Sequence, residues 1–132
     1  MIVDTSALIA ILQDEPQRRA FNEAIEAANS RAISAATLVE ASIVLEARFG
    51  AEAVRDLDFL VSKAQFTIAP VDAAQALIAR EAYRRFGKGR HPAGLNFGDC
   101  FSYALASAKG EPLLFKGEDF AQTDVELHPA SG

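Results

Sequence analysis

The chain has 132 residues, of which 50% are hydrophobic and 23% are charged, and these proportions fit one globular domain over residues 1–132. No apolar run approaches the roughly 20 residues of a membrane helix, and no basic leader precedes an apolar stretch, so we expect neither a membrane anchor nor a signal peptide. The single cysteine, Cys100, excludes an intramolecular disulfide, and together these features favour the cytosol. The net charge of −5 argues against a general nucleic-acid binder, although an average can hide a local pattern.

Short apolar segments alternate with longer amphipathic ones along the whole chain. In chain order, the pattern predicts a strand at 1–4, helices at 6–12 and 16–30, a strand at 31–35, helices at 36–50 and 51–65, a strand at 66–71, a helix at 72–87, a loop at 88–96, a helix at 97–110, a strand within 111–117 and a candidate last strand at 124–129. Pro16 suits the first turn of its helix, and Asp72 suits an N-cap. Such alternation predicts an α/β fold in which helices cover both faces of a parallel sheet.

Asp4 directly follows the first predicted strand. Ligands of parallel sheets bind outside the carboxyl ends of the strands, so Asp4 is a candidate site residue. Alternatively, Asp4 caps the next helix, although Ser6 could cap it instead.

Glu40 lies inside an apolar helical segment. Its helical neighbours are mostly apolar: Thr37, Ile43, Val44 and Ala47. An unpaired buried glutamate is rare because burying a charge is costly, so Glu40 is a candidate site residue too. The alternative is a glutamate at the edge of the stripe whose carboxylate reaches water.

Two further acids lie near a helix start or a strand end. Asp99 opens a nearly apolar helix, and the alternative for it is a capping box with Asn96. Asp119 follows the strand that ends near Phe115, with Glu118 beside it, and either could be a solvated loop charge.

The four acids Asp4, Glu40, Asp99 and Asp119 are more informative as a set. Two carboxylates about 5 Å apart repel each other by roughly 3 kcal/mol at an effective dielectric constant of 20. A cluster of them must therefore take up protons or bind a cation, and oxygen ligands select Mg²⁺ or Mn²⁺. A cation in an acidic cleft commonly activates water and stabilises charge on a phosphodiester.

Four segments, taken in order, resemble PIN-domain proteins, and most closely the VapC-type toxin ribonucleases of bacterial toxin–antitoxin pairs: MIVDTSALIAIL, SAATLVEASIVLEAR, GLNFGDCFSYALA and LLFKGEDFAQTDV. The resemblance implies a three-layer α/β/α domain with a parallel sheet of about five strands, and RNA cleavage that depends on Mg²⁺ or Mn²⁺. It matches Asp4, Glu40 and Asp99 to the acidic metal site and Asn96 to a polar position lining it, where we also place Ser6.

The fourth acid departs from the family pattern. Many members carry Thr or Ser and then an acid two residues later, where this chain has Phe115 and Gly117. Asp119 is the expected substitute, with Glu118 as the alternative. On this reading Asp4 and Asp99 bind the ion directly, whereas Glu40 and Asp119 bind through water, hold a second ion or orient the nucleophile. The only histidines, His91 and His128, would allow an acid–base ribonuclease in number, but neither forms a motif with the acids.

Basic residues gather just before the Asp99 helix: Arg84, Arg85, Lys88 and Arg90. They predict a rim that contacts RNA phosphates, with Phe86 as a stacking surface. The alternative is a solvated helix end, where basic side chains suit the helix dipole.

The resemblance also implies protein partners. A VapB-type antitoxin would lie along helices 36–65 and place a basic or blocking group among the acids. Leu57, Leu60 and Val61 could receive it, although their default role is core packing. The family also commonly forms homodimers and toxin–antitoxin hetero-oligomers.

Two other functions stay open from sequence. A haloacid-dehalogenase-type phosphatase would use Asp4 as a nucleophile, but it requires a second Asp at the position of Ser6. A catalytically silent PIN-like module would bind RNA or a partner without cleaving anything.

Overall fold

The computed structural model describes all 132 residues. Its centre is a sheet of four parallel strands in the order β3-β2-β1-β4, formed by β1 (Ile2–Val3), β2 (Ala32–Ser34), β3 (Thr67–Ala69) and β4 (Leu113–Leu114). The candidate strand at 124–129 is reduced to a single parallel bridge between Leu113 and Leu127. The predicted α/β class with a parallel sheet is confirmed, with four strands in place of about five.

The helices follow the sequence prediction within a few residues at each end. They are α1 (Thr5–Leu12), α2 (Arg18–Ala27), α3 (Ala35–Phe49), α4 (Ala51–Lys63), α5 (Ala73–Phe86) and α6 (Phe97–Lys109), followed by a 3₁₀ turn, η1 (Asp119–Gln122). Asp72 caps α5 as predicted, because its carboxylate accepts a hydrogen bond from the Gln75 N–H at 2.8 Å. Pro16 lies outside α2 and does not form its first turn, which corrects that prediction.

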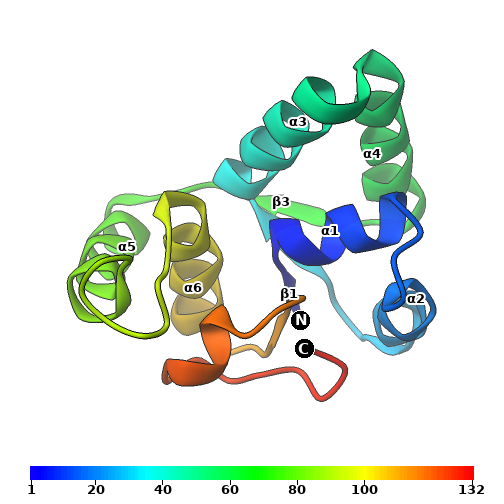
Figure 1. Cartoon of the computed structure of the whole chain (residues 1–132). Coiled ribbons are helices and arrows are strands. Elements are labelled where there is room, and N and C mark those ends of the chain that lie inside the picture. The colour runs from blue at the N-terminus through cyan, green and yellow to red at the C-terminus, as the bar shows by residue number, and fades with distance from the viewer.

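The strand residues alternate between two hydrophobic cores, as the period of two in a strand requires. Ile2, Ala32 and Leu113 pack with residues of α5 and α6. Their neighbours Val3, Ile33 and Leu114 pack with residues of α1 to α4. Figure 1 shows α5 and α6 on one side of β1 and α1 with α2 on the other, which gives the three layers.

The strand order places a reversal of chain direction between β1 and β4, at the carboxyl edge of the sheet. From β1 the chain moves outward through β2 to β3 and then returns to β4 on the opposite side of β1. Parallel sheets bind ligands at such a reversal, and Asp4 and Asp119 follow the two strands that flank it. No helix combines the length and the apolar character needed to cross a membrane.

Candidate active site

Asp4 is 2% exposed and links the end of β1 to the start of α1. It is the N-cap of α1: its Oδ2 accepts hydrogen bonds from the Ser6 N–H at 3.0 Å and from the Ser6 hydroxyl at 2.7 Å. Its Oδ1 accepts a hydrogen bond from the Ser102 hydroxyl at 2.6 Å. Asp4 therefore caps α1 at the carboxyl end of β1, and Ser6 supports Asp4 instead of replacing it as the cap.

Hydrogen bonds of the Ser6 hydroxyl also connect the segment after β4 with Asp4. Its hydroxyl oxygen accepts a hydrogen bond from the Lys116 N–H at 3.0 Å. The Lys116 ammonium pairs with Glu15, so its charge does not compensate Asp4.

The fourth acid lies on the exposed turn that follows. Partial burial raises the pKa of Asp119, and the charge of Asp4 raises it further. The charge of Asp4 therefore acts on Asp119, which stays the expected fourth acid, with Glu118 as the alternative.

Glu40 of α3 contacts the first turns of α1 and α6. Its Oε1 accepts a hydrogen bond from the Thr5 hydroxyl at 2.5 Å. Its Oε2 lies against Gly98 in the first turn of α6, where an added Cβ would lie only 1.7 Å from that oxygen. Burial raises the pKa of Glu40, the Thr5 hydrogen bond opposes this effect, and the charge of Asp4 adds to it. The carboxylate is thus held between the starts of α1 and α6.

Asp99 forms the capping box with Asn96 that the sequence allowed as an alternative. Asn96 Oδ1 accepts a hydrogen bond from the Asp99 N–H at 2.9 Å, and Asp99 Oδ2 accepts one from the Asn96 N–H at 3.0 Å. The second oxygen of Asp99 has no protein partner. The predicted polar residue Asn96 therefore caps the start of α6 and forms hydrogen bonds with both the backbone and the side chain of Asp99.

Asp99 interacts electrostatically with each of the other three acids. Burial raises the pKa of Asp99 to about 7, and the charge of Asp4, followed by those of Asp119 and Glu40, contributes to the rise. Only the backbone hydrogen bond at Asn96 opposes these effects. No Lys or Arg side chain forms an ion pair with any of the four carboxylates.

This donor set can be tested against a divalent cation. No three His, Cys, Asp or Glu side chains lie close enough together to enclose a metal ion by themselves. Mg²⁺ does not need such an enclosure, since it usually keeps several waters and binds through one or two carboxylates. Asp4 and Asp99 each retain free oxygen lone pairs, so the residues present fit an ion that is bound mostly by water.

Sequence reasoning missed four residues that shape this site: Thr5, Thr37, Gly98 and Ser102. A signal for two of them existed. Thr37 lies three residues before Glu40, and Ser102 lies three residues after Asp99, each in a helix whose buried face is otherwise apolar. The significance of Gly98 and Thr5 depends on Glu40, which is remote in sequence, and no local pattern indicates it.

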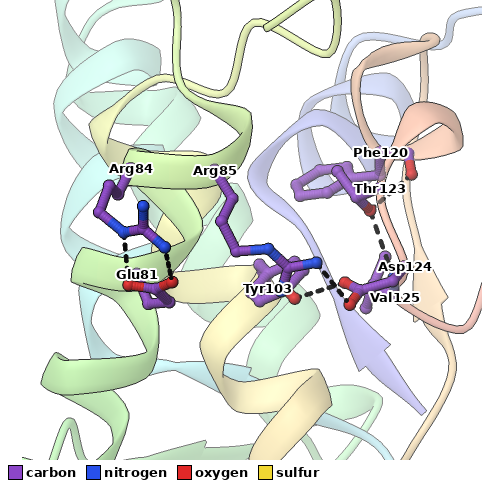
Figure 2. A network of polar contacts seen from close by, with 8 residues as sticks. All are labelled: Glu81, Arg84, Arg85, Tyr103, Phe120, Thr123, Asp124 and Val125. Atoms are coloured by element: carbon purple, nitrogen blue, oxygen red, sulfur yellow. Dashed lines mark hydrogen bonds and ion pairs between the residues drawn. The ribbon is translucent and has the colours of Figure 1, made fainter. Parts of the chain in front are cut away.

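Only part of the predicted basic rim is free of ion pairs with acidic side chains. Figure 2 shows Arg84 paired with Glu81, and Arg85 directed at Asp124, whose carboxylate also accepts a hydrogen bond from the Tyr103 hydroxyl. The Arg85–Asp124 distance is 3.3 Å. Lys88 and Arg90 are exposed and form no ion pair, so these two carry the uncompensated positive charge of the segment.

Phe86 is not a stacking surface, which corrects the prediction. Its ring is buried against Tyr103 of α6 and the edge of His91, and the Arg85 guanidinium covers it at 4.6 Å. Leu57 is fully buried, and Leu60 and Val61 pack against the same core, so their default role is confirmed.

The two histidines support local backbone turns. The Nδ1 of His91 accepts a hydrogen bond from the Ala93 N–H, and the Nδ1 of His128 accepts one from the Ala130 N–H, both at 3.0 Å. The structure gives no support to a paired-histidine mechanism.

Comparison with known proteins agrees with this architecture. The family model of the PIN domain matches residues 1–126. The chain belongs to the PIN-domain family. VapC ribonuclease Mb0640 of Mycobacterium bovis is 54% identical over 125 residues, which is 95% of each chain. Ribonuclease VapC of Mycolicibacterium smegmatis is also 54% identical over 125 residues, covering 95% of this chain and 97% of that protein. The resemblance to VapC-type proteins is thereby confirmed.

Solved structures share the fold at lower identity. The Sarcin-Ricin loop cleaving toxin VapC20 of Mycobacterium tuberculosis has a TM-score of 0.77 at 19% identity, with 94% of this chain and 95% of that chain covered. VapBC2 of Rickettsia felis, bound to a DNA fragment from its promoter, also has a TM-score of 0.77, at 15% identity, with 99% and 97% covered. The family assignment argues against the phosphatase alternative.

Proposed function

We propose that this PIN-domain protein is the endoribonuclease toxin of a toxin–antitoxin pair, and that it hydrolyses RNA phosphodiesters with Mg²⁺ or Mn²⁺ in the cytosol. The observation that carries the proposal is a set of four carboxylates without a basic partner, in which burial and the charge of Asp4 raise the pKa values of Glu40, Asp99 and Asp119. The names of the VapC relatives, 54% identical to this chain, support the ribonuclease activity.

The chain's own groups divide the work between binding and orientation. Asp4 and Asp99 would hold the ion, because each is fixed at a rigid element end and keeps a free lone pair. Glu40 and Asp119 would bind it through water or orient the attacking water. A bound divalent cation would supply an activated water and stabilise charge on the scissile phosphate. Because the pKa of Asp99 is about 7, this carboxyl is partly protonated near neutral pH and would give up its proton when it holds a cation.

The RNA contact is proposed for the free cations Lys88 and Arg90, with Arg84 and Arg85 contributing less because acids already pair with them. A rim of this size provides modest affinity, which suits a protein whose net charge is −5.

The proposed partners are a VapB-type antitoxin and a second copy of the chain. The toxin–antitoxin complex from Klebsiella pneumoniae shares the fold, with a TM-score of 0.70 at 20% identity. A groove of about 400 Å³ lies beside Glu40 between α3 and α6, and its walls include the exposed Val39, Ile43 and Phe97. We propose that the antitoxin contacts α3 and α4 and reaches the acids, and that the apolar face of α3 and α6 supports homodimers.

The test of the proposed activity uses two matched N-cap residues. Asp4 caps α1 inside the acid cluster, and Asp72 caps α5 outside it. Purified protein is incubated with total RNA in Mg²⁺ or in chelator, and the cut ends are mapped. We expect cleavage by the wild type and by Asp72→Asn in Mg²⁺ only, and none by Asp4→Asn.

Cleavage that persists in chelator would contradict the role of the metal. Equal cleavage by Asp4→Asn and Asp72→Asn would contradict the role of the acid cluster. A wild type that neither cleaves RNA nor binds Mn²⁺ would identify the silent module.

A further inference from the structure

Two buried hydroxyl groups lie directly behind Asp4. Ser102 of α6 is 0% exposed and Thr37 of α3 is 1% exposed. The Ser102 hydroxyl donates to Asp4 Oδ1 at 2.6 Å, and the hydroxyl oxygens of Ser102 and Thr37 are 3.3 Å apart. The chain Thr37–Ser102–Asp4 thus connects three elements that are remote in sequence.

The direction of this hydrogen-bond chain follows from a proton count. A carboxylate only accepts hydrogen bonds, and a serine hydroxyl has one proton to donate. Because the Ser102 proton is directed at Asp4, the contact with Thr37 requires that Thr37 donates and Ser102 accepts. The order is therefore Thr37 to Ser102 to Asp4.

The same count describes what Asp4 offers to a ligand. A carboxylate has about four lone-pair sites. Ser6 uses two of them on Oδ2, and Ser102 uses one on Oδ1. One lone pair on Oδ1 remains. The two Ser6 bonds hold Oδ2, and the Ser102 bond is the one protein contact that holds Oδ1.

A comparison with Ser42 shows that this arrangement is not the default for a serine inside a helix. The Ser42 hydroxyl of α3 donates to the Leu38 carbonyl, four residues earlier, at 2.7 Å. This local bond is the common solution for a helical serine. Ser102 instead donates across the core to a residue 98 positions away.

We propose that Ser102 is a positioning residue that fixes Asp4 Oδ1 for a divalent cation, and that Thr37 sets the direction of the Ser102 proton. The inference rests on the metal site of the proposed function. It assigns to two buried hydroxyls a part in metal binding, because groups that orient metal ligands commonly control affinity without touching the ion.

The test measures Mn²⁺ affinity by isothermal titration calorimetry on metal-free protein, so it does not depend on turnover. We expect Ser102→Ala to bind Mn²⁺ about 10- to 100-fold more weakly than the wild type. Ser42→Ala, which removes a helical hydroxyl that does not contact Asp4, should stay within about twofold. Wild-type affinity in Ser102→Ala would overturn the inference.

Asp4→Asn in the same titration separates this inference from the proposed function. If Asp4→Asn abolishes Mn²⁺ binding and Ser102→Ala does not weaken it, only the positioning role fails. If Asp4→Asn binds Mn²⁺ as the wild type does, the proposed metal site itself fails, and the inference fails with it.

A second pair of variants covers the case in which Ser102→Ala does not fold. Thr37→Val keeps the shape of the side chain and removes the donor, whereas Thr37→Ser keeps the donor. We expect Thr37→Val to bind Mn²⁺ several-fold more weakly than Thr37→Ser, which should match the wild type. Equal affinity in these two variants would contradict the directed hydrogen-bond chain.

Discussion

The acid cluster and the basic segment at residues 84–90 are both groups of like charges, but the fold treats them differently. The acids Asp4, Glu40 and Asp99 are brought together from three elements, and no basic side chain pairs with them. Arg84 and Arg85 lie on one exposed helix end and find acidic partners in Glu81 and Asp124. A charge cluster that the fold assembles and leaves uncompensated is thus the stronger indication of a site.

The pKa values express the same difference. Burial raises the pKa of Asp99 to about 7. By contrast, the Tyr103 hydrogen bond and the Arg85 charge lower the pKa of Asp124. The ionised form of Asp99 is destabilised, so this carboxyl can exchange its proton for a cation. The ionised form of Asp124 is already stabilised by its protein partners. Four predictions test this contrast.

The largest expected effect compares one acid from each region. Asp99→Asn should lower the rate of RNA cleavage in Mg²⁺ about a thousandfold, because loss of a metal ligand removes several kcal/mol of transition-state stabilisation. Asp124→Asn should lower it by no more than about twofold, as for an ordinary surface change. Initial rates on one RNA substrate provide the measurement. Similar losses in both variants would remove the distinction between the regions.

Gly98→Ala should lower cleavage about 100-fold, because a new Cβ displaces the Glu40 carboxylate and small misplacements of catalytic groups are costly. The thermal midpoint should change little, since the displaced group is the end of a flexible side chain. In a Glu40→Ala background, Gly98→Ala should add no further loss. A full additional loss there would show that Gly98 acts independently of Glu40.

The contribution of Asp99 to the stability of the metal-free protein should fall as the pH rises from about 4 to 7. The folded-state pKa of Asp99 is about 7, above its ordinary value of 3.8, so the folded state holds the proton more tightly. This contribution is complete below about pH 4 and is lost as the pH rises through 7. Urea denaturation in chelator measures the free energy of unfolding at each pH. In Asp99→Asn, this free energy should change less steeply with pH. An identical slope in that variant would contradict the assignment.

The smallest expected effect concerns RNA binding. On the Asp4→Asn background, which leaves the RNA intact, Lys88→Glu with Arg90→Glu should weaken binding several-fold. The slope of log affinity against log salt should fall by about 0.7 for each lost phosphate contact. Arg84→Ala with Arg85→Ala should change both quantities less, since these arginines are already paired. An equal or larger effect of the arginine pair would exclude Lys88 and Arg90 as the main contacts.

The sequence predicts most of the fold because its strands are short apolar runs between longer amphipathic helices. It overestimates the last strand, since Leu127 alone pairs with β4. It also places Pro16 inside a helix that begins at Arg18. The second difference concerns the end of an element, where boundaries are least certain, whereas the first is a whole strand reduced to a single bridge.

Within the site, acids in apolar surroundings are visible in sequence, and Asp4, Glu40 and Asp99 stand out for this reason. Ser102 and Gly98 do not, because their significance arises from contacts with Asp4 and Glu40 that only the fold creates. Phe86 shows the reverse error: the charges around it suggest exposure, yet its ring lies on the buried face of α5.

The central claim is that the carboxylates of this PIN-domain protein converge on one divalent cation at the carboxyl edge of the sheet. Anomalous diffraction from crystals soaked in Mn²⁺ tests it most directly. We predict a manganese peak within coordination distance of Asp4 Oδ1 and of an Asp99 oxygen. If crystals soaked in saturating Mn²⁺ showed no peak between these two residues, or showed manganese only elsewhere, that result would contradict the account.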